Sequence, residues 1–195
     1  MTSPVWETPL GSLRRGRHAL LYHRGPDLAA RVAARYAADG LGNEEAVVLS
    51  AEPVELERIG LLLSGIGVDV ERERDANNLL FVQSDTEQAS RLAVDVKYLV
   101  TWIREQARDR QTRIWNHWSG ALAEQGKWTE GSTLEASLGE LKGDATVLCH
   151  VNLEHMPGDP VASLEMLGTL HDALFTQTGH AALEFRDQRS PVIAR

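Results

Sequence analysis

The stretch His18-Ala-Leu-Leu-Tyr-His23, followed by Arg24-Gly-Pro-Asp27, decides the fold. Its apolar residues predict a buried β-strand. The glycine and proline then break the strand, and a proline is tolerated in the first turn of a helix. Leu28, Val32 and Tyr36 follow at helical spacing on one face. The sequence therefore predicts a strand, a short loop and a helix, which is how a β-α-β unit begins.

The same alternation continues along the rest of the chain. Further strands are predicted at Ala46–Ser50, Asn78–Val82, Thr112–Trp118, Thr146–Val151 and Ala181–Phe185. One helix is expected after Pro53, with Gly65 as its cap. Two more begin at predicted capping boxes: Asp85/Gln88 starts a helix whose apolar face is Leu92, Val96, Leu99 and Ile103, and Ser132/Glu135 starts a helix whose apolar face includes Leu138. A last helix has Leu164, Leu167, His171 and Leu174 on one face. Six strands separated by helices predict a three-layer αβα fold around a mainly parallel sheet.

The length and composition fit one ordinary domain. The chain has 195 residues, of which 43% are hydrophobic and 25% are charged, close to the globular average. We expect a flexible leader over residues 1–16, a single α/β domain over 17–187 and a flexible tail over 188–195.

Charge and cysteine content limit the partners and the compartment. The formal net charge of −8 disfavours direct nucleic-acid binding, and the short basic run at residues 14–17 fits a solvated leader better than a phosphate contact. Cys149 is the only cysteine, so the chain forms no internal disulfide, as is typical of a reducing compartment. No apolar run reaches membrane-spanning length, and residues 1–17 do not resemble a signal peptide. We expect a cytoplasmic protein without a membrane partner.

The loop after the first strand lacks the residues that bind nucleotide phosphates. A P-loop needs several glycines and a Lys-Ser/Thr pair. The segment Tyr22–Asp27 has one glycine, no lysine, and an acid where phosphate would lie. Hydrolysis of ATP or GTP is therefore not expected.

Several segments occur in an order that resembles the MEDS family, a sensory domain of methanogens, methylotrophs and a dichloromethane-responsive regulator. The matching segments are His18 to Tyr22 with a shorter spacing than in the family, Asp39–Leu41, Ala46–Leu49, Leu63–Val70, Arg113–Ile114 with Ala121–Leu122, Leu134–Leu138, Val147–Cys149 and Leu170–Asp172. The similarity covers about residues 17–175. It implies a degenerate RecA/KaiC-like domain without a Walker motif.

The chain departs from the family pattern at four positions. The family's Glu falls on His117, its Trp on Gly120, its Tyr on Val151 and its final Pro on Asp172. Because these positions bear on the pocket, the resemblance does not carry over the identity of a ligand.

Histidines and the single cysteine could form a metal or redox site. However, no Cys-x-x-Cys, His-x-x-x-His or His-Glu-x-x-His spacing occurs. We therefore expect hydrogen-bonded histidines, and neither a metal nor another cofactor. Cys149 lies in an apolar strand and His150 points to the opposite face, so a Cys149–His150 pair is not expected.

Ligands of open parallel sheets bind at the carboxyl ends of the strands. Aromatic and polar side chains gather at those ends and suit a small organic ligand, although packing of the tryptophans in the core is an equal alternative. The candidate ligand-binding residues are His18, Tyr22, His23, Trp115, His117, Trp118, Glu135, His150, Asn152 and His171.

Three functions remain open from the sequence. The first is a non-enzymatic sensory domain that binds a small molecule or a signalling protein, with a homodimer possible. The second is a residual KaiC-like nucleotide binder with anion contacts from Arg17, Arg24 or Arg113. The third is an enzyme with Glu135, His117 and His171 as acid–base groups, which nothing in the spacing requires.

Overall fold

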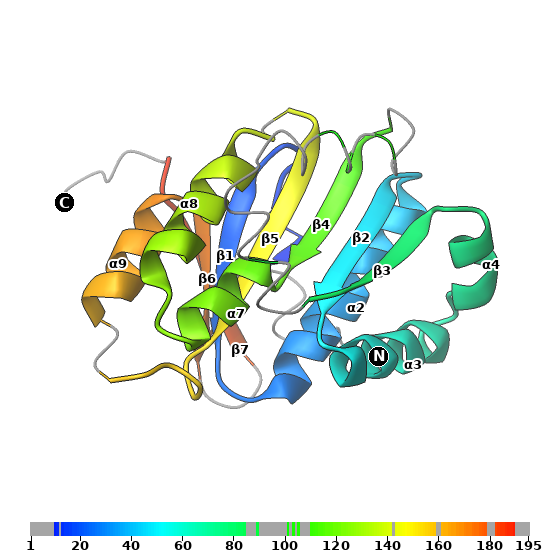
Figure 1. Ribbon diagram of the computed structural model, residues 1–195. Helices are drawn as coiled ribbons and strands as arrows, with labels where there is room; N and C mark the ends of the chain where they lie inside the picture. Colours follow the sequence, from blue (N-terminus) through cyan, green and yellow to red (C-terminus); the bar gives the residue numbers. More distant parts are fainter. Residues whose placement is uncertain are drawn as a thin grey trace.

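A seven-stranded sheet forms the centre of the protein in the computed structural model (Figure 1). The structure describes residues 10–11, 13–84, 89, 101, 103, 105, 110–141, 143–158, 161–178 and 182–189. The strands lie in the order β3-β2-β4-β5-β1-β6-β7. They are β1 (His18–His23), β2 (Ala46–Ala51), β3 (Leu79–Gln83), β4 (Thr112–Asn116), β5 (Ala145–Asn152), β6 (Ala173–Thr178) and β7 (Ala182–Asp187).

The sheet is parallel except at one edge, where β7 runs antiparallel to β6. β1 lies inside the sheet between β5 and β6, and every residue of β5 is buried. Parallel sheets are covered on both faces, so their inner strands are buried on both sides. This confirms the predicted mixed α/β, three-layer fold.

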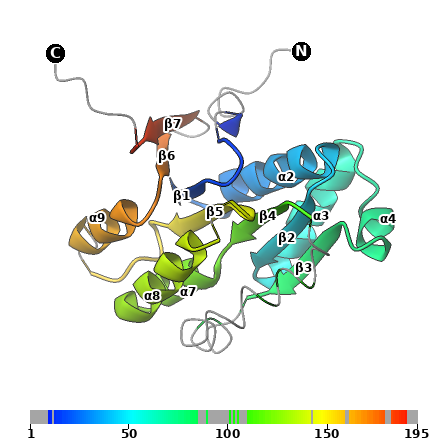
Figure 2. The same ribbon diagram turned by 90° about the horizontal axis from the view of Figure 1, so that it is seen from above.

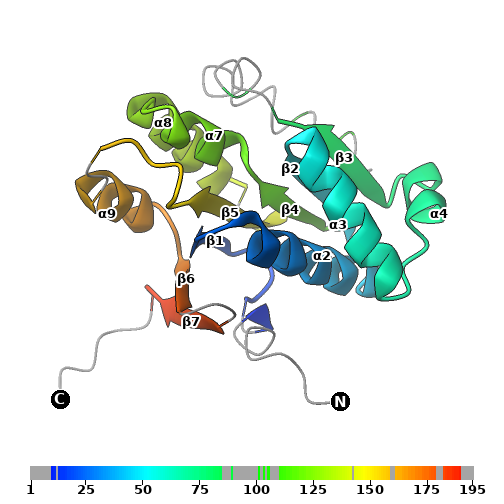
Figure 3. The same cartoon turned by 90° about the horizontal axis from the view of Figure 1, so that it is seen from below.

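Helices cover both faces of the sheet (Figures 2 and 3). The described helices are α2 (Pro26–Gly42), α3 (Pro53–Gly65), α4 (Val70–Asp75), α7 (Trp118–Glu124), α8 (Trp128–Gly139) and α9 (Val161–Thr169). α2 and α3 pack on one face, and α7, α8 and α9 pack on the other. Among the described residues, no helix combines the length and apolar character needed to cross a membrane.

The core consists of two apolar clusters, one on each face of the sheet. Leu28 and Val32 belong to the cluster under α2, whereas Leu138 and Ile103 belong to the one under α7 and α8. These predicted core residues are buried, but on two faces and not in one cluster. The predicted core residues Leu92, Val96 and Leu99, and the Asp85/Gln88 capping box, lie outside the described residues.

The fourth strand is shorter than predicted, because the chain turns at Asn116. The side-chain oxygen of Asn116 accepts a hydrogen bond from the backbone N–H of Trp118 at 3.0 Å. This contact starts α7, a short helix that the sequence did not predict. His117 is its N-cap residue and therefore no longer belongs to the strand.

The predicted capping box at Ser132 and Glu135 is wrong. α8 begins four residues earlier, at Trp128, and the Ser132 hydroxyl donates to the Trp128 carbonyl inside the helix at 2.7 Å. Glu135 lies on the buried face of α8 instead of at a helix end. Gly65 is also not the left-handed cap of α3, since the positive φ of 92° falls on Gly67.

The last predicted helix is too long. α9 ends at Thr169, and Leu174 belongs to β6, a strand that the sequence analysis missed. The spacing of Leu164, Leu167 and Leu174 imitates a helical stripe, but β6 pairs with β1 in the sheet. The backbone N–H of Asp172 donates to the His18 carbonyl at 2.7 Å, and this long-range pairing overrides the local pattern.

Candidate functional site

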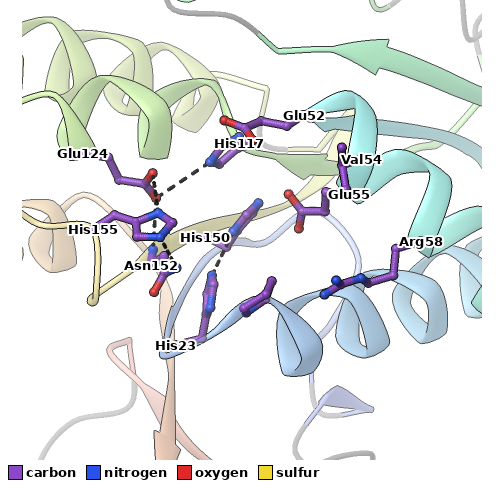
Figure 4. A pocket seen from close by; sticks show the side chains of 11 residues that line it. His23, Glu52, Val54, Glu55, Arg58, His117, Glu124, His150, Asn152 and His155 are labelled. Atoms are coloured by element: carbon purple, nitrogen blue, oxygen red, sulfur yellow. Dashed lines mark hydrogen bonds and ion pairs between the residues drawn. The ribbon is translucent and has the colours of Figure 1, made fainter.

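A cavity of about 190 Å³ opens at the carboxyl edge of the sheet (Figure 4). β1 and β5 end there in His23 and Asn152. His150 also lies in β5, and the other lining residues come from the segments after β1, β2, β4 and β5. The lining side chains are His23, Pro26, Glu52, Val54, Glu55, Arg58, His117, Glu124, His150, Asn152 and His155. This cavity, which we call the edge pocket, lies at the edge of the sheet where the sequence analysis expected a ligand site.

His150 is buried in the wall of the edge pocket and stacked between two rings. Its ring centroid lies 4.4 Å from that of Trp115 and 4.8 Å from that of His117, with interplanar angles of 23° and 15°. Figure 4 shows His150 among His23, His117 and Glu55. This stack fixes the orientation of the imidazole.

The hydrogen bonds of His23 determine which nitrogens of His150 carry protons. His23 Nδ1 lies 3.1 Å from the Gly25 carbonyl, which can only accept, so Nδ1 donates and Nε2 carries a lone pair. His150 Nδ1 lies 3.1 Å from that Nε2 and must donate to it. Neutral His150 therefore has a lone pair on Nε2, a buried atom without a hydrogen-bond partner.

Both rings are kept neutral by their surroundings. Burial lowers the pKa of His23 to about 4. Burial, with the nearby His117 and His23, lowers the pKa of His150 well below its ordinary value. His150 Nε2 is thus a hydrogen-bond acceptor that needs a donor from elsewhere.

His117 and Glu124 form the polar side of the edge pocket. His117 Nδ1 lies 3.1 Å from the Ser84 hydroxyl, and its Nε2 lies 3.8 Å from Glu124 Oε1. Burial alone would lower the pKa of His117, but Glu124, Glu55 and Glu52 raise it overall. The other oxygen of Glu124 contacts exposed His155 at 3.3 Å.

Carboxylates dominate the charge of the edge pocket. Burial raises the pKa of Glu55, whose carboxylate lies within 4.8 Å of donor atoms of His117 and His150. Arg58, the only arginine among the described lining residues, forms an ion pair with Asp27 at 2.9 Å. The pocket therefore presents acceptors and negative charge to a ligand.

A second group of candidate residues meets inside the protein, on the opposite face of the sheet. His18 of β1, Glu135 of α8, Cys149 of β5 and His171 before β6 are each at most 4% exposed. Their donor atoms all lie within 4.8 Å of one another. We call these four residues the buried cluster. As expected from strand alternation, His150 and Cys149 point to opposite faces of the sheet. Cys149 Sγ instead lies 3.2 Å from Nε2 of a different histidine, His18.

The ten predicted site residues thus separate into three groups. His23, His117, His150 and Asn152 line the edge pocket, and His18, Glu135 and His171 belong to the buried cluster. Tyr22 faces α9, where its hydroxyl donates to the Leu164 carbonyl at 2.6 Å. Trp115 and Trp118 are core residues on opposite faces of the sheet.

Several lining residues were missed by the sequence analysis. Glu52 and Glu55 follow β2, and the rule that placed His23 and Asn152 at strand ends would have found them if applied to that strand. Glu124 had no such signal, because its helix α7 was not predicted. His155 follows the end of β5 and was not among the predicted site residues.

Fold and pocket together define an α/β domain with a cavity of about 190 Å³ at the carboxyl edge of a mainly parallel sheet. The sequence pattern described as "MEthanogen/methylotroph, DcmR Sensory domain" (MEDS) matches residues 17–167. The chain belongs to the MEDS family of sensory domains. No curated protein matches it.

Proposed function

We propose that this MEDS domain is a non-enzymatic sensor that binds a small neutral or cationic organic molecule in the edge pocket. The observation that carries this proposal is the buried, unpartnered Nε2 of His150. A hydroxyl or amine of the ligand would donate to this nitrogen and satisfy it. Glu55 and His117, close to it on either side, would hold further polar groups of the same ligand.

The alternative of a residual nucleotide binder has less support. Phosphates need positive charge or free backbone N–H groups. Arg17 binds Asp187 at 2.7 Å and Arg113 binds Glu45 at 2.6 Å, both at the amino edge of the sheet. Within the lining, Arg58 is paired with Asp27 and three glutamates face the cavity.

The relation to RecA/KaiC-type NTPases is part of the same proposal. In those proteins a strand leads through a phosphate-binding loop into a helix. Here β1 leads through Arg24 and Gly25 into α2, so the loop occupies the same place with different residues. We expect no hydrolysis of ATP or GTP above background. A magnesium-dependent turnover that is lost on changing Arg24 or Asp27 would contradict this expectation.

Trp115 offers a direct readout for ligand binding, since its ring stacks on His150. A panel of small alcohols and primary amines, with acetate and Mg-ATP as anionic comparisons, would be titrated against tryptophan fluorescence. We expect saturable binding of one alcohol or amine that His150→Phe removes, because phenylalanine keeps the stack but has no acceptor. Leu61→Ala, at an exposed position of α3 outside the lining, is the control and should keep binding.

Tight binding of Mg-ATP without binding of any alcohol or amine would favour the nucleotide alternative. An equal response of the wild type and His150→Phe would remove His150 from the site. A protein partner is the remaining sensory alternative, supported by the exposed apolar residues Val54 and Leu61 of α3, which are 71% and 70% exposed.

A further inference from the structure

The geometry points to a transition-metal site in the buried cluster, with a divalent ion of the zinc class bound by His18 Nε2, Glu135 Oε2, Cys149 Sγ and His171 Nε2. Its location on the other face of the sheet separates it from the edge pocket. The proposal therefore does not depend on what the edge pocket binds.

The four donor atoms already converge. Glu135 Oε2 lies 3.0 Å from His18 Nε2, 3.0 Å from Cys149 Sγ and 3.0 Å from His171 Nε2, and His18 Nε2 lies 3.2 Å from Cys149 Sγ. In a tetrahedral zinc site with normal bond lengths, such atoms lie about 3.3–3.6 Å apart. These four separations would each need to lengthen by about 0.3–0.5 Å to hold the ion, and all the donor atoms already lie within 4.8 Å of one another.

His171 supplies the strongest argument for a cation. Its Nδ1 lies 2.7 Å from the Leu167 carbonyl, so Nδ1 must donate and the Nε2 of neutral His171 carries a lone pair. That Nε2 has no hydrogen-bond partner, although it lies 3.0 Å from a carboxylate oxygen. If His171 is protonated, this contact is an ion pair with Glu135. If His171 is neutral, two lone pairs face each other in a buried site, and a metal ion between them would replace that repulsion with two bonds.

The surrounding hydrogen bonds also fit metal ligands. Metal-binding histidines usually donate their second nitrogen to a carbonyl, as His171 does to Leu167. The Ser119 hydroxyl donates to Glu135 Oε1, the oxygen that faces away from the other three donors. Asn116 Nδ2 donates to Cys149 Sγ at 3.2 Å. Each of these three ligands is therefore oriented by a partner outside the cluster.

The ligand set and its burial indicate the kind of ion. Two imidazoles, one carboxylate and one thiolate match the borderline-soft preferences of Zn²⁺, and calcium or magnesium would need a shell of oxygens. Four protein ligands without an open position are typical of structural zinc sites. The Cys149 thiol would release its proton to the solvent when the sulfur binds the ion.

The residues of the buried cluster come from β1, α8, β5 and the segment before β6. They are far apart in the sequence, so no short chelating motif could reveal them. The second group of possible ligands among the described residues, Glu55, His117 and His150, has three members and opens on the edge pocket. A variant in this second group can therefore serve as a control for variants in the buried cluster.

Metal analysis of the full chain and a cobalt titration would test the proposal. Purified protein should contain about one zinc ion per chain, and the chelated protein should bind about one Co²⁺. Cobalt in this site should show intense tetrahedral d–d bands and a thiolate-to-cobalt charge-transfer band. Cys149→Ser should lose the charge-transfer band, and Ser119→Ala, a mild change next to Glu135, should weaken Co²⁺ binding about 10–100-fold.

His117→Asn is the matched control, because it alters a buried histidine that lines the edge pocket and is not part of the buried cluster. It should leave the cobalt spectrum and the metal content unchanged. The proposal is wrong if folded wild-type protein neither contains metal nor binds Co²⁺. It is equally wrong if the spectrum lacks a sulfur band or if His117→Asn, and not Cys149→Ser, removes it.

Discussion

Replacing Gly120 with alanine should destabilise the protein, because α7 lies directly against the backbone of β5. A Cβ atom at this position would lie 2.4 Å from the His150 carbonyl oxygen and 3.3 Å from His117 Cδ2. Contacts below 3.0 Å essentially do not occur, so α7 would have to retreat from the sheet by about 0.6 Å or more. Overpacking of this kind lowers the free energy of unfolding by about 1–3 kcal/mol. The higher helix propensity of alanine offsets up to about 1 kcal/mol of this loss.

We expect Gly120→Ala to lower the free energy of unfolding by about 1–2 kcal/mol, which corresponds to a fall in Tm of about 2–8 °C. Urea denaturation and calorimetry would measure both quantities. Gly60→Ala is the matched control inside α3, where the added Cβ makes an ordinary contact of 3.5 Å with Phe81. It should be neutral or slightly stabilising. A Gly120→Ala midpoint equal to or above that of the wild type would refute the close approach of α7 and β5.

Three further changes test the buried polar groups and the core. Arg113→Met removes the 2.6 Å ion pair of buried Glu45, which keeps a 2.9 Å ion pair with half-exposed Arg15. It should therefore cost less in urea denaturation than the roughly 3–5 kcal/mol of a fully unpaired buried charge, and adding Glu45→Leu should recover much of this loss. The pKa of His23, about 4 in the fold against 6.5 unfolded, means that its unfolded state binds more protons in this range. Stability should therefore fall by up to about 3 kcal/mol as the pH drops from 6.5 to 4, and His23→Asn should flatten that part of the profile. Leu138→Ala should cost about 2–5 kcal/mol, whereas Leu61→Ala on the exposed face of α3 should cost little; equal midpoints for the two would contradict the assigned core.

The sequence predicted the elements whose signal is local. The apolar runs of β1, β2 and β5, and the first-turn prolines of α2 and α3, define those elements without long-range information. The errors occurred where tertiary contacts decide. β6 forms because it pairs with β1, and α7 begins because the Asn116 side chain captures the Trp118 N–H.

The candidate site shows the same division. Strand-end reasoning placed His23, His150 and Asn152 at the edge pocket, because parallel strands all finish on one side. The buried cluster could not be predicted in this way. His18 lies at the opposite end of β1 from the pocket, and Glu135 was assigned to a helix cap. Only the packing of α8 on the sheet brings the two side chains within 3.0 Å.

Cys149 and His150 are neighbours in β5, yet they serve chemical groups on opposite faces of the sheet. β5 is hydrogen-bonded to β4 on one side and to β1 on the other. A slip of one residue against these strands would exchange the two faces, pointing the imidazole at Glu135 and the sulfur at Trp115. Such a slip would disrupt the buried cluster and the edge pocket at the same time. An insertion or deletion of a single residue within β5 should thus be less tolerated than any single substitution there.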